Sequence, residues 1–324
     1  MKHNRLISGL ISAAALVAAS VVPAAAEWPE RAVTFIVGYP AGGTTDIVAR
    51  LVANELQGKL GQPVVVENRP GAAGQTGTTA VAQSEADGHT LLFTIGSHTI
   101  LPAVNADLPY DAVASFEPVA MVGTSPNMIL VKSDDEIKTL EDYINAAKAD
   151  PGELDYGTPG VGTTTHVTAA MLEQKAGISL SHIPYKGSGP TSQALMAGEI
   201  RSALGSIISA GPMVRDGRFH AVAIVGDERS PLLPDVPTFK EQGYDGILGN
   251  NWLGLMAPAK TPSDVVTKLA GVIEELVTSA EFQKKLEEQG VQAEFMNPET
   301  FKKVMDDEVA AYKELATQVN LKSE

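Results

Sequence analysis

Hydrophobic positions along this chain follow two alternating patterns. Short runs rich in Val, Ile and Leu are typical of buried strands, and between them apolar residues recur every three or four positions, which is typical of amphipathic helices. This alternation predicts a parallel sheet covered by helices on both faces. In the first third of the chain, the predicted elements are a strand at Ala32–Val37, a helix from Thr44 or Thr45 to Gly61, a strand at Val64–Val66, a helix of small residues to Ala86 and a strand at Thr90–Ile95.

The same alternation continues through the middle of the chain, and the C-terminal part is helical. Thr261–Asp264 and Asn297-Pro298 combine capping residues with proline, which is typical of helix starts. Two α/β lobes are therefore expected. The predicted middle elements are strands at Met128–Val131, Leu154–Gly157, Leu180–Pro184, Arg201–Gly205 and Phe219–Val225, with helices at Leu140–Ala149, Thr164–Lys175 and Pro190–Ala197.

The N-terminus has the pattern of a secretory signal peptide. Lys2 and Arg5 precede the apolar stretch Leu6–Val22, and Ala24–Ala26 provides an A-x-A cleavage pattern. The alternative is an uncleaved membrane anchor, but the stretch is short for a membrane span and contains serines. We therefore expect residues 1–26 to be a signal peptide cleaved after Ala26, and the protein to be periplasmic.

Composition excludes several classes of function. The chain has 324 residues and a formal net charge of −15, so a nucleic-acid partner is not expected. It contains no cysteine, which excludes disulfides, thiolate catalysis and zinc–thiolate sites. Export makes chemistry that depends on cytoplasmic nucleotides improbable, and no cofactor is expected.

Three glycine-rich turns lie between predicted strands and helices. They are Ala41–Asp46, Gly160–His166 and Tyr185–Pro190, and each combines glycines with hydroxyl residues. Ligands of open α/β sheets bind beyond the carboxyl ends of the strands, where backbone N–H groups and helix starts attract anions. Each turn taken alone also fits a simple turn and helix cap. The three together favour a cleft that holds a small carboxylate.

Several polar side chains in these turns have two possible roles. Asp46 fits either a helix-dipole partner or a ligand-site residue. His98 and His166 follow strands and fit either a ligand donor or a buried histidine. Lys186 fits either a solvated charge or a cation that steers a carboxylate.

Sequence motifs of enzymes and metal sites are absent from the chain. No GxSxG, GxxxxGK[ST] or HExxH motif occurs, and no two histidines are spaced four apart. Gly187–Gly189 begins like a GxGxxG motif, but Ser192 stands at the third glycine position. An exported hydrolase or lyase acting on a small carboxylate stays an alternative, as does an envelope protein with a structural role.

Long motifs in a defined order resemble a known family. The resemblance is to the tripartite tricarboxylate transporter substrate-binding proteins, also called the Bug family, and it covers essentially the whole chain after residue 26. The motifs are YPAGGTTD (Tyr39–Asp46), VVENRPGAAG (Val65–Gly74), EADGHTLLF (Glu85–Phe93), HIPYKGSGPTSQALMAGEI (His182–Ile200), RSPLLPDVPTFKEQGY (Arg229–Tyr244) and WLGLMAPAKTP (Trp252–Pro262).

This resemblance implies an α/β, two-lobe periplasmic-binding-protein fold, with each lobe a sheet flanked by helices and the ligand cleft between the lobes. Lobe 1 would comprise residues 27–125 and 247–324, and lobe 2 residues 126–246. The implied function is to capture a small organic carboxylate between two closing lobes and deliver it to the membrane subunits of a tripartite tricarboxylate-type transporter. A ligand-sensing role in signalling is the alternative within this family. A monomer is expected.

The resemblance also implies the ligand-binding residues, which lie in loops that follow strands in both lobes. Asn251 and Trp252 are further candidates to contact the ligand, although Trp252 fits a core position equally well. The implied residues are Tyr39, Ala41, Gly42, Gly43, Thr44, Asp46, Ser97, His98, Gly162, Thr163, Thr164, His166, Lys186, Gly187, Ser188, Ser206 and Asn251.

Some positions depart from the family pattern. Gly38 and Ala73 differ in the first two motifs, and Leu204–Ile207 replaces a segment that often carries Phe or Asp and Asn. Arg201 and Ser202 stand where an acidic residue is frequent. These departures leave the far end of the ligand open, so mono-, di- and tricarboxylates, amino acids and aromatic acids all stay compatible with the sequence.

Overall fold

The structure is a computed structural model that describes residues 27–319 and 321. The predicted signal peptide and its cleavage site lie outside the described residues. In chain order, the elements are β1 (Val33–Val37), α1 (Thr44–Leu60), β2 (Val64–Asn68), η1 (Ala72–Gly74), α2 (Gln75–Ala82), β3 (Thr90–Ile95), α3 (Ser97–Val104), β4 (Phe116–Lys132), α4 (Leu140–Ala149), β5 (Asp155–Thr158), α5 (Thr164–Ala176), β6 (Ser181–Pro184), α6 (Ser188–Ala197), β7 (Ser202–Ser206), α7 (Ile207–Arg215), β8 (Phe219–Ile224), β9 (Asn250–Pro258), α8 (Ser263–Val277), α9 (Ala280–Glu288), β10 (Gln292–Met296) and α10 (Pro298–Leu315).

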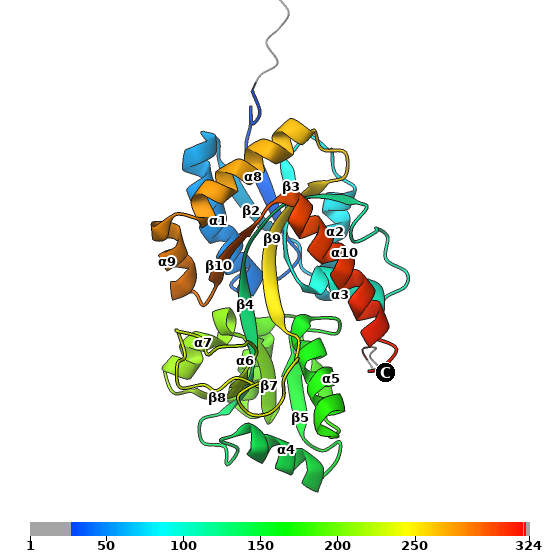
Figure 1. Ribbon diagram of the computed structural model, residues 1–324, viewed down its shortest axis with the longest axis vertical. Coiled ribbons are helices and arrows are strands. Elements are labelled where there is room, and N and C mark those ends of the chain that lie inside the picture. Colours follow the sequence, from blue (N-terminus) through cyan, green and yellow to red (C-terminus); the bar gives the residue numbers. More distant parts are fainter. Residues whose placement is uncertain (1–26, 320, 322–324) are drawn as a thin grey trace, which may run out of the picture.

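The long strand β4 belongs to two sheets. Its first part pairs antiparallel with β9 and β10, and from Asn127 onward it pairs antiparallel with β7 and β8. The first sheet therefore has the order β2-β1-β3-β9-β4-β10, and the second has the order β8-β4-β7-β5-β6. Figure 1 shows the first sheet with α1, α2, α8 and α10 in the upper half of the molecule, and the second sheet with α4 to α7 in the lower half.

The prediction of parallel strands is confirmed among β1, β2 and β3 and among β5, β6 and β7, but each sheet as a whole is mixed. β1 is parallel to β2 and β3, and β5 is parallel to β6 and β7, but β9 runs antiparallel to both of its neighbours. The helical connections after β1, β5 and β6 explain the parallel parts, because such crossovers return the chain in the same direction. β9 enters the sheet from the other end of the chain, and its direction is not set by a local crossover.

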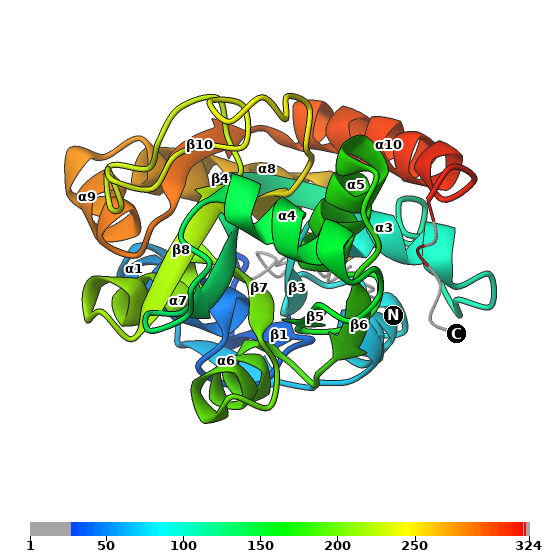
Figure 2. The same ribbon diagram turned by 90° about the horizontal axis from the view of Figure 1, so that it is seen from below.

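Helices cover both faces of each sheet, as the sequence predicts. In β1, Phe35 packs in the cluster that contains Val48 of α1, whereas the next residue, Ile36, packs on the opposite face near Phe301 of α10. Successive side chains of a strand point to opposite faces, so a continuous apolar run is buried on both. For the second sheet, Figure 2 shows α4 and α5 on one side and α6 on the other.

Most predicted elements of the first and middle regions are present within one or two residues, and several of the unpredicted ones contain proline or glycine. Gly61 and Gly177 end α1 and α5 in the left-handed conformation, with φ of 68° and 62°. The elements that the sequence did not predict are α3, α7, α9, β9, β10 and the first part of β4. α3 and α7 contain proline, and β4 contains Gly123 and Pro126, which weaken the local signal for a helix or strand.

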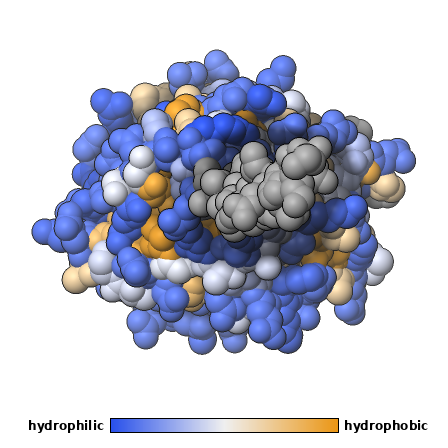
Figure 3. Space-filling view, turned by 90° about the horizontal axis from the view of Figure 1, so that it is seen from above, coloured by the Kyte–Doolittle hydropathy of each residue, from blue (hydrophilic) through white to orange (hydrophobic). Residues whose placement is uncertain are grey.

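The face of the molecule that Figure 3 shows is predominantly hydrophilic. The face in Figure 3 carries hydrophobic areas only in small, separate groups. None of the helices in the described part of the chain is long and apolar enough to cross a membrane.

Candidate functional site

A cavity of about 120 Å³ lies where helices of both sheets begin. Its walls come from the loops that follow β1, β3, β5, β6 and β7, together with residues of β4 and β9. This is the edge at which open α/β sheets bind their ligands. The cavity is lined by Tyr39, Pro40, Ala41, Gly42, Gly43, Thr44, Thr45, Ile95, Ser97, Asn127, Pro159, Thr163, Thr164, Thr165, Gly187, Ser188, Gly189, Pro190, Ser206 and Asn251.

Five helices, α1, α3, α5, α6 and α7, direct their N-termini toward this cavity. The first N–H groups of a helix have no partner within the helix, and the helix dipole places partial positive charge there. The N-cap residues of α1 and α6, Gly43 and Gly187, have no side chain with which to cap these groups. The N-terminal N–H groups of both helices are therefore available to an anion in the cavity.

The lining of the cavity carries no formal charge. Among the residues that the structure describes, its side chains include no Asp, Glu, Lys, Arg or His. The polar groups are hydroxyls, two asparagine amides and backbone amides. The cavity therefore offers an anion many neutral donors and no counter-ion.

Asp46 shapes the first loop of the site from outside the cavity. Its carboxylate accepts hydrogen bonds from the Gly42 N–H at 2.8 Å, from Arg50 Nε at 3.0 Å and from Asn68 Nδ2 at 2.9 Å. Burial pushes the pKa of Asp46 upward, but the hydrogen bonds from Arg50, Gly42 and Asn68 outweigh it and hold the pKa below its usual value. Of its two predicted roles, its position in the first turn of α1 fits that of a helix-dipole partner, and its hydrogen bond from Gly42 also fixes the loop.

Contacts cross the cavity from one sheet's loops to the other's. Thr44 Oγ1 at the start of α1 lies 2.6 Å from Ser206 Oγ at the start of α7. A Cβ atom on Gly187 would lie 3.0 Å from Cγ of Pro40. The loops of the two halves are thus in direct contact, and a larger side chain at Gly187 would separate them.

The Asn251 side chain has a defined orientation at the other end of the cavity. Its Oδ1 accepts the N–H of Gly96 at 3.0 Å, and a backbone N–H can only donate. The amide nitrogen Nδ2 is therefore the group of Asn251 that is left for a ligand, and it is a donor. Asn251 lies on β9 and is 3% exposed.

Twelve of the seventeen predicted ligand residues line the cavity. They are Tyr39, Ala41, Gly42, Gly43, Thr44, Ser97, Thr163, Thr164, Gly187, Ser188, Ser206 and Asn251. The structure brings these residues together from six separate stretches of the chain. Their role in ligand binding stays a prediction.

The other five predicted residues, Asp46, His98, Gly162, His166 and Lys186, do not line the cavity. His98 turns into the core of the first half, where Nε2 lies 2.6 Å from the carbonyl oxygen of Ala112 and the ring stacks with Tyr110. Burial lowers the pKa of His98 to about 4, so the ring is neutral at pH 7. Lys186 is exposed on the surface beside Gly187.

His166 and Gly162 lie behind the cavity wall. The His166 ring stacks on His182 with 4.3 Å between ring centroids, and burial lowers its pKa to about 3. The Gly162 N–H points to Nδ1 of His166 at 3.4 Å. Gly162, with φ of 75°, packs so closely on Val104 of α3 that a Cβ atom would lie 2.8 Å from Cγ2 of that residue. Both residues support the α5 loop from outside the lining.

Eight lining residues were missed by the sequence analysis. Most of them are neighbours of predicted residues in the same turns, so the sequence pattern of those turns could have identified them. Asn127 is the exception, because it lies inside β4 where only the pairing of β4 with β7 brings it to the cavity. The missed residues are Pro40, Thr45, Ile95, Asn127, Pro159, Thr165, Gly189 and Pro190.

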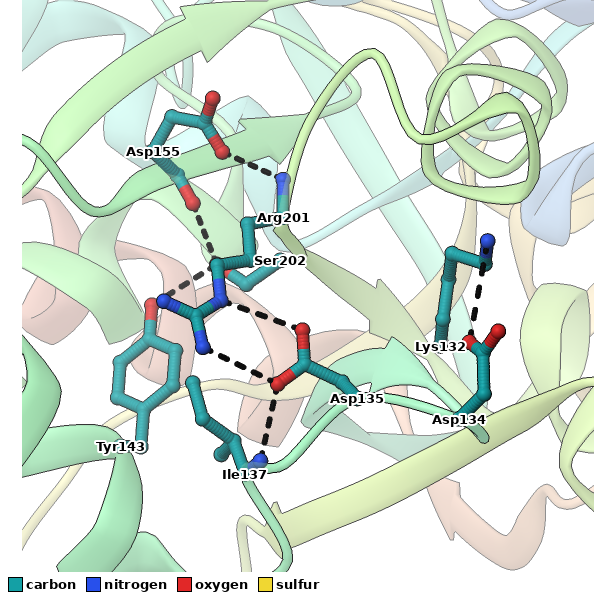
Figure 4. Close-up of polar contacts among 8 residues, drawn as sticks. All are labelled: Lys132, Asp134, Asp135, Ile137, Tyr143, Asp155, Arg201 and Ser202. Atoms are coloured by element: carbon teal, nitrogen blue, oxygen red, sulfur yellow. Dashed lines mark hydrogen bonds and ion pairs between the residues drawn. The ribbon is translucent and has the colours of Figure 1, made fainter.

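Arg201 and Ser202, two of the positions that differ from the family pattern, lie away from the cavity. Figure 4 shows Arg201 beside Asp135 and Asp155, and Ser202 hydrogen-bonded to Tyr143 and Asp155. Ser202 begins β7 and the lining residue Ser206 ends it, so the two lie about 13 Å apart at roughly 3.3 Å per residue. Arg201 and Ser202 therefore do not line the cavity, and whether they affect ligand choice stays a prediction.

Trp252 is a core residue. It is 3% exposed, its ring packs edge-on against Phe301, and its Nε1 donates to Oε2 of Glu308 at 2.7 Å. Thr99 Oγ1 donates to the same oxygen at 2.7 Å. Burial raises the pKa of Glu308, against the effect of these two hydrogen bonds. This buried group ties α10 to β9 and α3 behind Asn251.

Comparisons with known proteins agree with the fold. Residues 48–321 match the family described as tripartite tricarboxylate transporter family receptor. BugT of Bordetella pertussis is 33% identical over 313 residues, which cover 95% of this chain and 95% of BugT.

Two similar structures were solved with dicarboxylic acids. An R. palustris protein solved with adipate is 30% identical, with a TM-score of 0.87 over 90% of this chain and 99% of that chain. MatC from Rhodopseudomonas palustris, solved with bound malate, is 30% identical, with a TM-score of 0.81 over 88% of this chain and 99% of that chain. The predicted α/β, two-lobe periplasmic-binding-protein fold is confirmed by such similarities.

Proposed function

The chain belongs to the family of tripartite tricarboxylate transporter receptors, and from this we propose that it is a periplasmic receptor for a small organic carboxylate. In this proposal it captures the acid between its two halves and delivers it to the membrane subunits of a tripartite tricarboxylate-type transporter. The adipate and malate of the two similar structures support a dicarboxylate as the first class to test.

The convergence of helix N-termini on an uncharged cavity carries this proposal. With a formal net charge of −15, the protein as a whole repels anions, so attraction has to act locally. Five helix starts supply that attraction at short range through oriented N–H groups. A neutral ligand would gain less from these partial positive charges than an anion does, and a cationic ligand would be repelled by them.

The proposed contacts use neutral donors on both sides of the cavity. On one side, N–H groups of α1 and the hydroxyl of Thr44 bind a carboxylate, together with N–H groups of α6. On the other side, Nδ2 of Asn251 and the start of α5 bind the remainder of the ligand. The other cavity residues complete the enclosure.

Closure of two lobes is part of the proposal. Residues 27–125 and 247–324 form one lobe and residues 126–246 the other, with crossings in β4 near Pro126 and in the segment before β9. The pairing of β4 supports this division, because β4 changes partners from β9 to β7 between Pro126 and Asn127. Since the cavity walls come from both lobes, neither completes the site alone.

A ligand panel tests the proposed function directly. Thermal unfolding is measured for the protein without residues 1–26 in the presence of mono-, di- and tricarboxylates, aromatic acids, amino acids and neutral sugars. A ligand that binds only the folded protein raises Tm, so at least one carboxylate is expected to do so while the sugars do not. Calorimetry then gives Kd, and recovery of the unaltered acid distinguishes a receptor from a hydrolase or lyase. Absence of stabilisation by every acid contradicts the proposal.

Two further measurements test location and closure. N-terminal sequencing of the protein recovered from the periplasmic fraction is expected to begin at residue 27, and a full-length chain in the membrane fraction contradicts this. Small-angle scattering is expected to show a smaller radius of gyration once the best acid of the panel saturates the protein. A larger or unchanged radius at saturation contradicts closure.

A further inference from the structure

Asn127 borders the cavity from the point where β4 passes between the two sheets. It is completely buried, and its backbone is held on both sides, because its N–H donates to Gly249 and its carbonyl oxygen accepts from Val225. Its side chain is therefore part of a rigid framework at the junction of the two halves.

The hydrogen bonds of Asn127 determine which atom of its side-chain amide is the oxygen Oδ1 and which is the nitrogen Nδ2. Nδ2 donates to Thr164 Oγ1 at 3.1 Å and to Thr168 Oγ1 at 3.4 Å. Thr168 directs its only hydroxyl proton to main-chain carbonyl oxygens, at 2.9 Å from Thr164 and 2.8 Å from Leu248. The oxygen of Thr168 can therefore only accept from Asn127, and a flipped amide would place two acceptors together.

With Nδ2 assigned, the other amide atom, Oδ1, is an acceptor without a partner. Oδ1 of Asn127 is buried and makes no hydrogen bond among the described residues. A buried acceptor left unpaired is costly, so such groups normally have a partner in a protein or its ligand. Since Asn127 borders the cavity, we expect an occupant of the cavity to supply the missing donor.

We propose that Asn127 selects a hydroxy-substituted carboxylate, with the ligand hydroxyl donating to Oδ1. This inference rests on the proposed carboxylate-binding function and names the class of acid. An unsubstituted acid has no donor for Oδ1, because its carboxylates only accept. An acid with a hydroxyl beside a carboxylate satisfies both the helix N-termini and the amide oxygen.

The electrostatics of the cavity favour a hydroxyl over an ammonium group. An amino acid would also bring a donor, but its donor carries a positive charge. The described lining contains no carboxylate to balance that charge, and five helix N-termini point toward it. Because a buried charge needs a partner of opposite sign, the neutral hydroxyl is the better donor here.

Matched series of acids test this selectivity in the wild-type protein. Succinate, malate and aspartate differ only in the H, OH or NH3⁺ at one carbon, as do glutarate, 2-hydroxyglutarate and glutamate, and propionate, lactate and alanine. In the series that binds, calorimetry is expected to give the hydroxy acid a Kd about ten- to a hundredfold lower than that of the unsubstituted acid. The amino acid is expected to bind more weakly than the hydroxy acid.

The Asn127→Ala variant tests whether this residue is the cause. Its ratio of Kd values for the unsubstituted and hydroxy acids is expected to approach one, while the unsubstituted acid still binds. Asn145→Ala, on the exposed side of α4, is the matched control and is expected to keep the wild-type ratio. If Asn127→Ala does not fold, the wild-type series alone decides.

The outcomes separate this inference from the proposed function. If an unsubstituted acid or an amino acid binds as tightly as its hydroxy counterpart, or if Asn127→Ala keeps the wild-type ratio, the inference is wrong while the receptor function stands. If no acid of these series or of the wider panel binds, the proposed function fails and the inference fails with it.

Discussion

Thr44 Oγ1 and Ser206 Oγ lie 2.6 Å apart, and their hydrogen bond joins the start of α1 to the start of α7. The two helices belong to different sheets, and the bond crosses the cavity that both help to line. The contact therefore exists only while the two halves are together, and we expect it to form when the proposed lobes close on a ligand.

We expect Thr44→Val and Ser206→Ala to weaken ligand binding through this shared contact. A hydrogen bond between neutral groups contributes about 0.5–1.5 kcal/mol, or roughly two- to tenfold in Kd. In a double-mutant cycle, the Kd of the best acid of the panel is measured for both single variants and the double variant. A coupling energy of about 1 kcal/mol is expected, and strictly additive effects would show that the bond does not contribute to the bound state.

Gly187→Ala is expected to weaken binding at least tenfold. Gly187 has φ of 108°, which strains any other residue, and its Cβ would lie 3.0 Å from Cγ of Pro40 in the opposite half. Gly189→Ala is the matched control in the same loop, since its Cβ would meet no atom within 4 Å. Calorimetry on both variants checks this, with circular dichroism as the test of folding. Equal Kd values for the two variants would contradict the close approach of the loops.

Lys186→Ala is expected to change Kd less than twofold, because the side chain is exposed and outside the cavity lining. Gly43→Val is expected to weaken binding about tenfold or more by removing one or two hydrogen bonds to the anion. Gly43 has an ordinary φ of −82°, but its Cβ would lie 3.2 Å from the carbonyl oxygen of Pro40 and crowd the loop. A larger increase in Kd for Lys186→Ala than for Gly43→Val would mean that an ion pair, and not neutral donors, holds the anion.

Asp46→Asn is expected to lower both stability and ligand affinity without any contact to the ligand. The substitution removes the charge that holds Arg50 and alters the acceptors for Gly42 and Asn68. For such a buried, hydrogen-bonded carboxylate we expect a loss of about 2 kcal/mol in the free energy of unfolding. Asp306→Asn, in an exposed pair with Lys302, is the control and is expected to change it by less than about 0.5 kcal/mol. Urea titration measures both variants, and equal losses would contradict the role of Asp46.

Stability is expected to fall as the pH drops from 7 to 5.5. Burial lowers the pKa of His98 to about 4 and that of His166 to about 3, whereas a histidine in the unfolded chain titrates near pH 6.5. At pH values between the folded and the unfolded pKa, the unfolded state binds more protons than the folded state, so the free energy of unfolding rises with pH. Each of these two histidines lowers the free energy of unfolding at pH 5.5 by about 1 kcal/mol relative to pH 7. Urea titrations at both pH values test this. His98→Gln is expected to reduce the difference in the free energy of unfolding between pH 7 and pH 5.5 by about 1 kcal/mol. An unchanged difference would contradict the conclusion that buried, neutral His98 contributes to it.

Local patterns in the sequence determined much of the fold and part of the site. The apolar run of β1 and the glycines after it predicted a strand, a turn and a helix, and Gly43 at the N-cap of α1 is what leaves the helix start open to an anion. The motif from Tyr39 to Thr44 also placed the right residues at the cavity. Backbone conformation and helix starts depend on a few neighbouring residues, so a single sequence contains this information.

Tertiary structure alone decided which residues face the cavity and which face away. His98 and His166 stand in the right loops, but their rings pack on Tyr110 and His182 in the interior. Asn127 carries no local signal and reaches the cavity only because β4 changes its partner there. Side-chain direction and the meeting of distant strands result from packing between elements far apart in the chain, and no pattern within one segment records that packing.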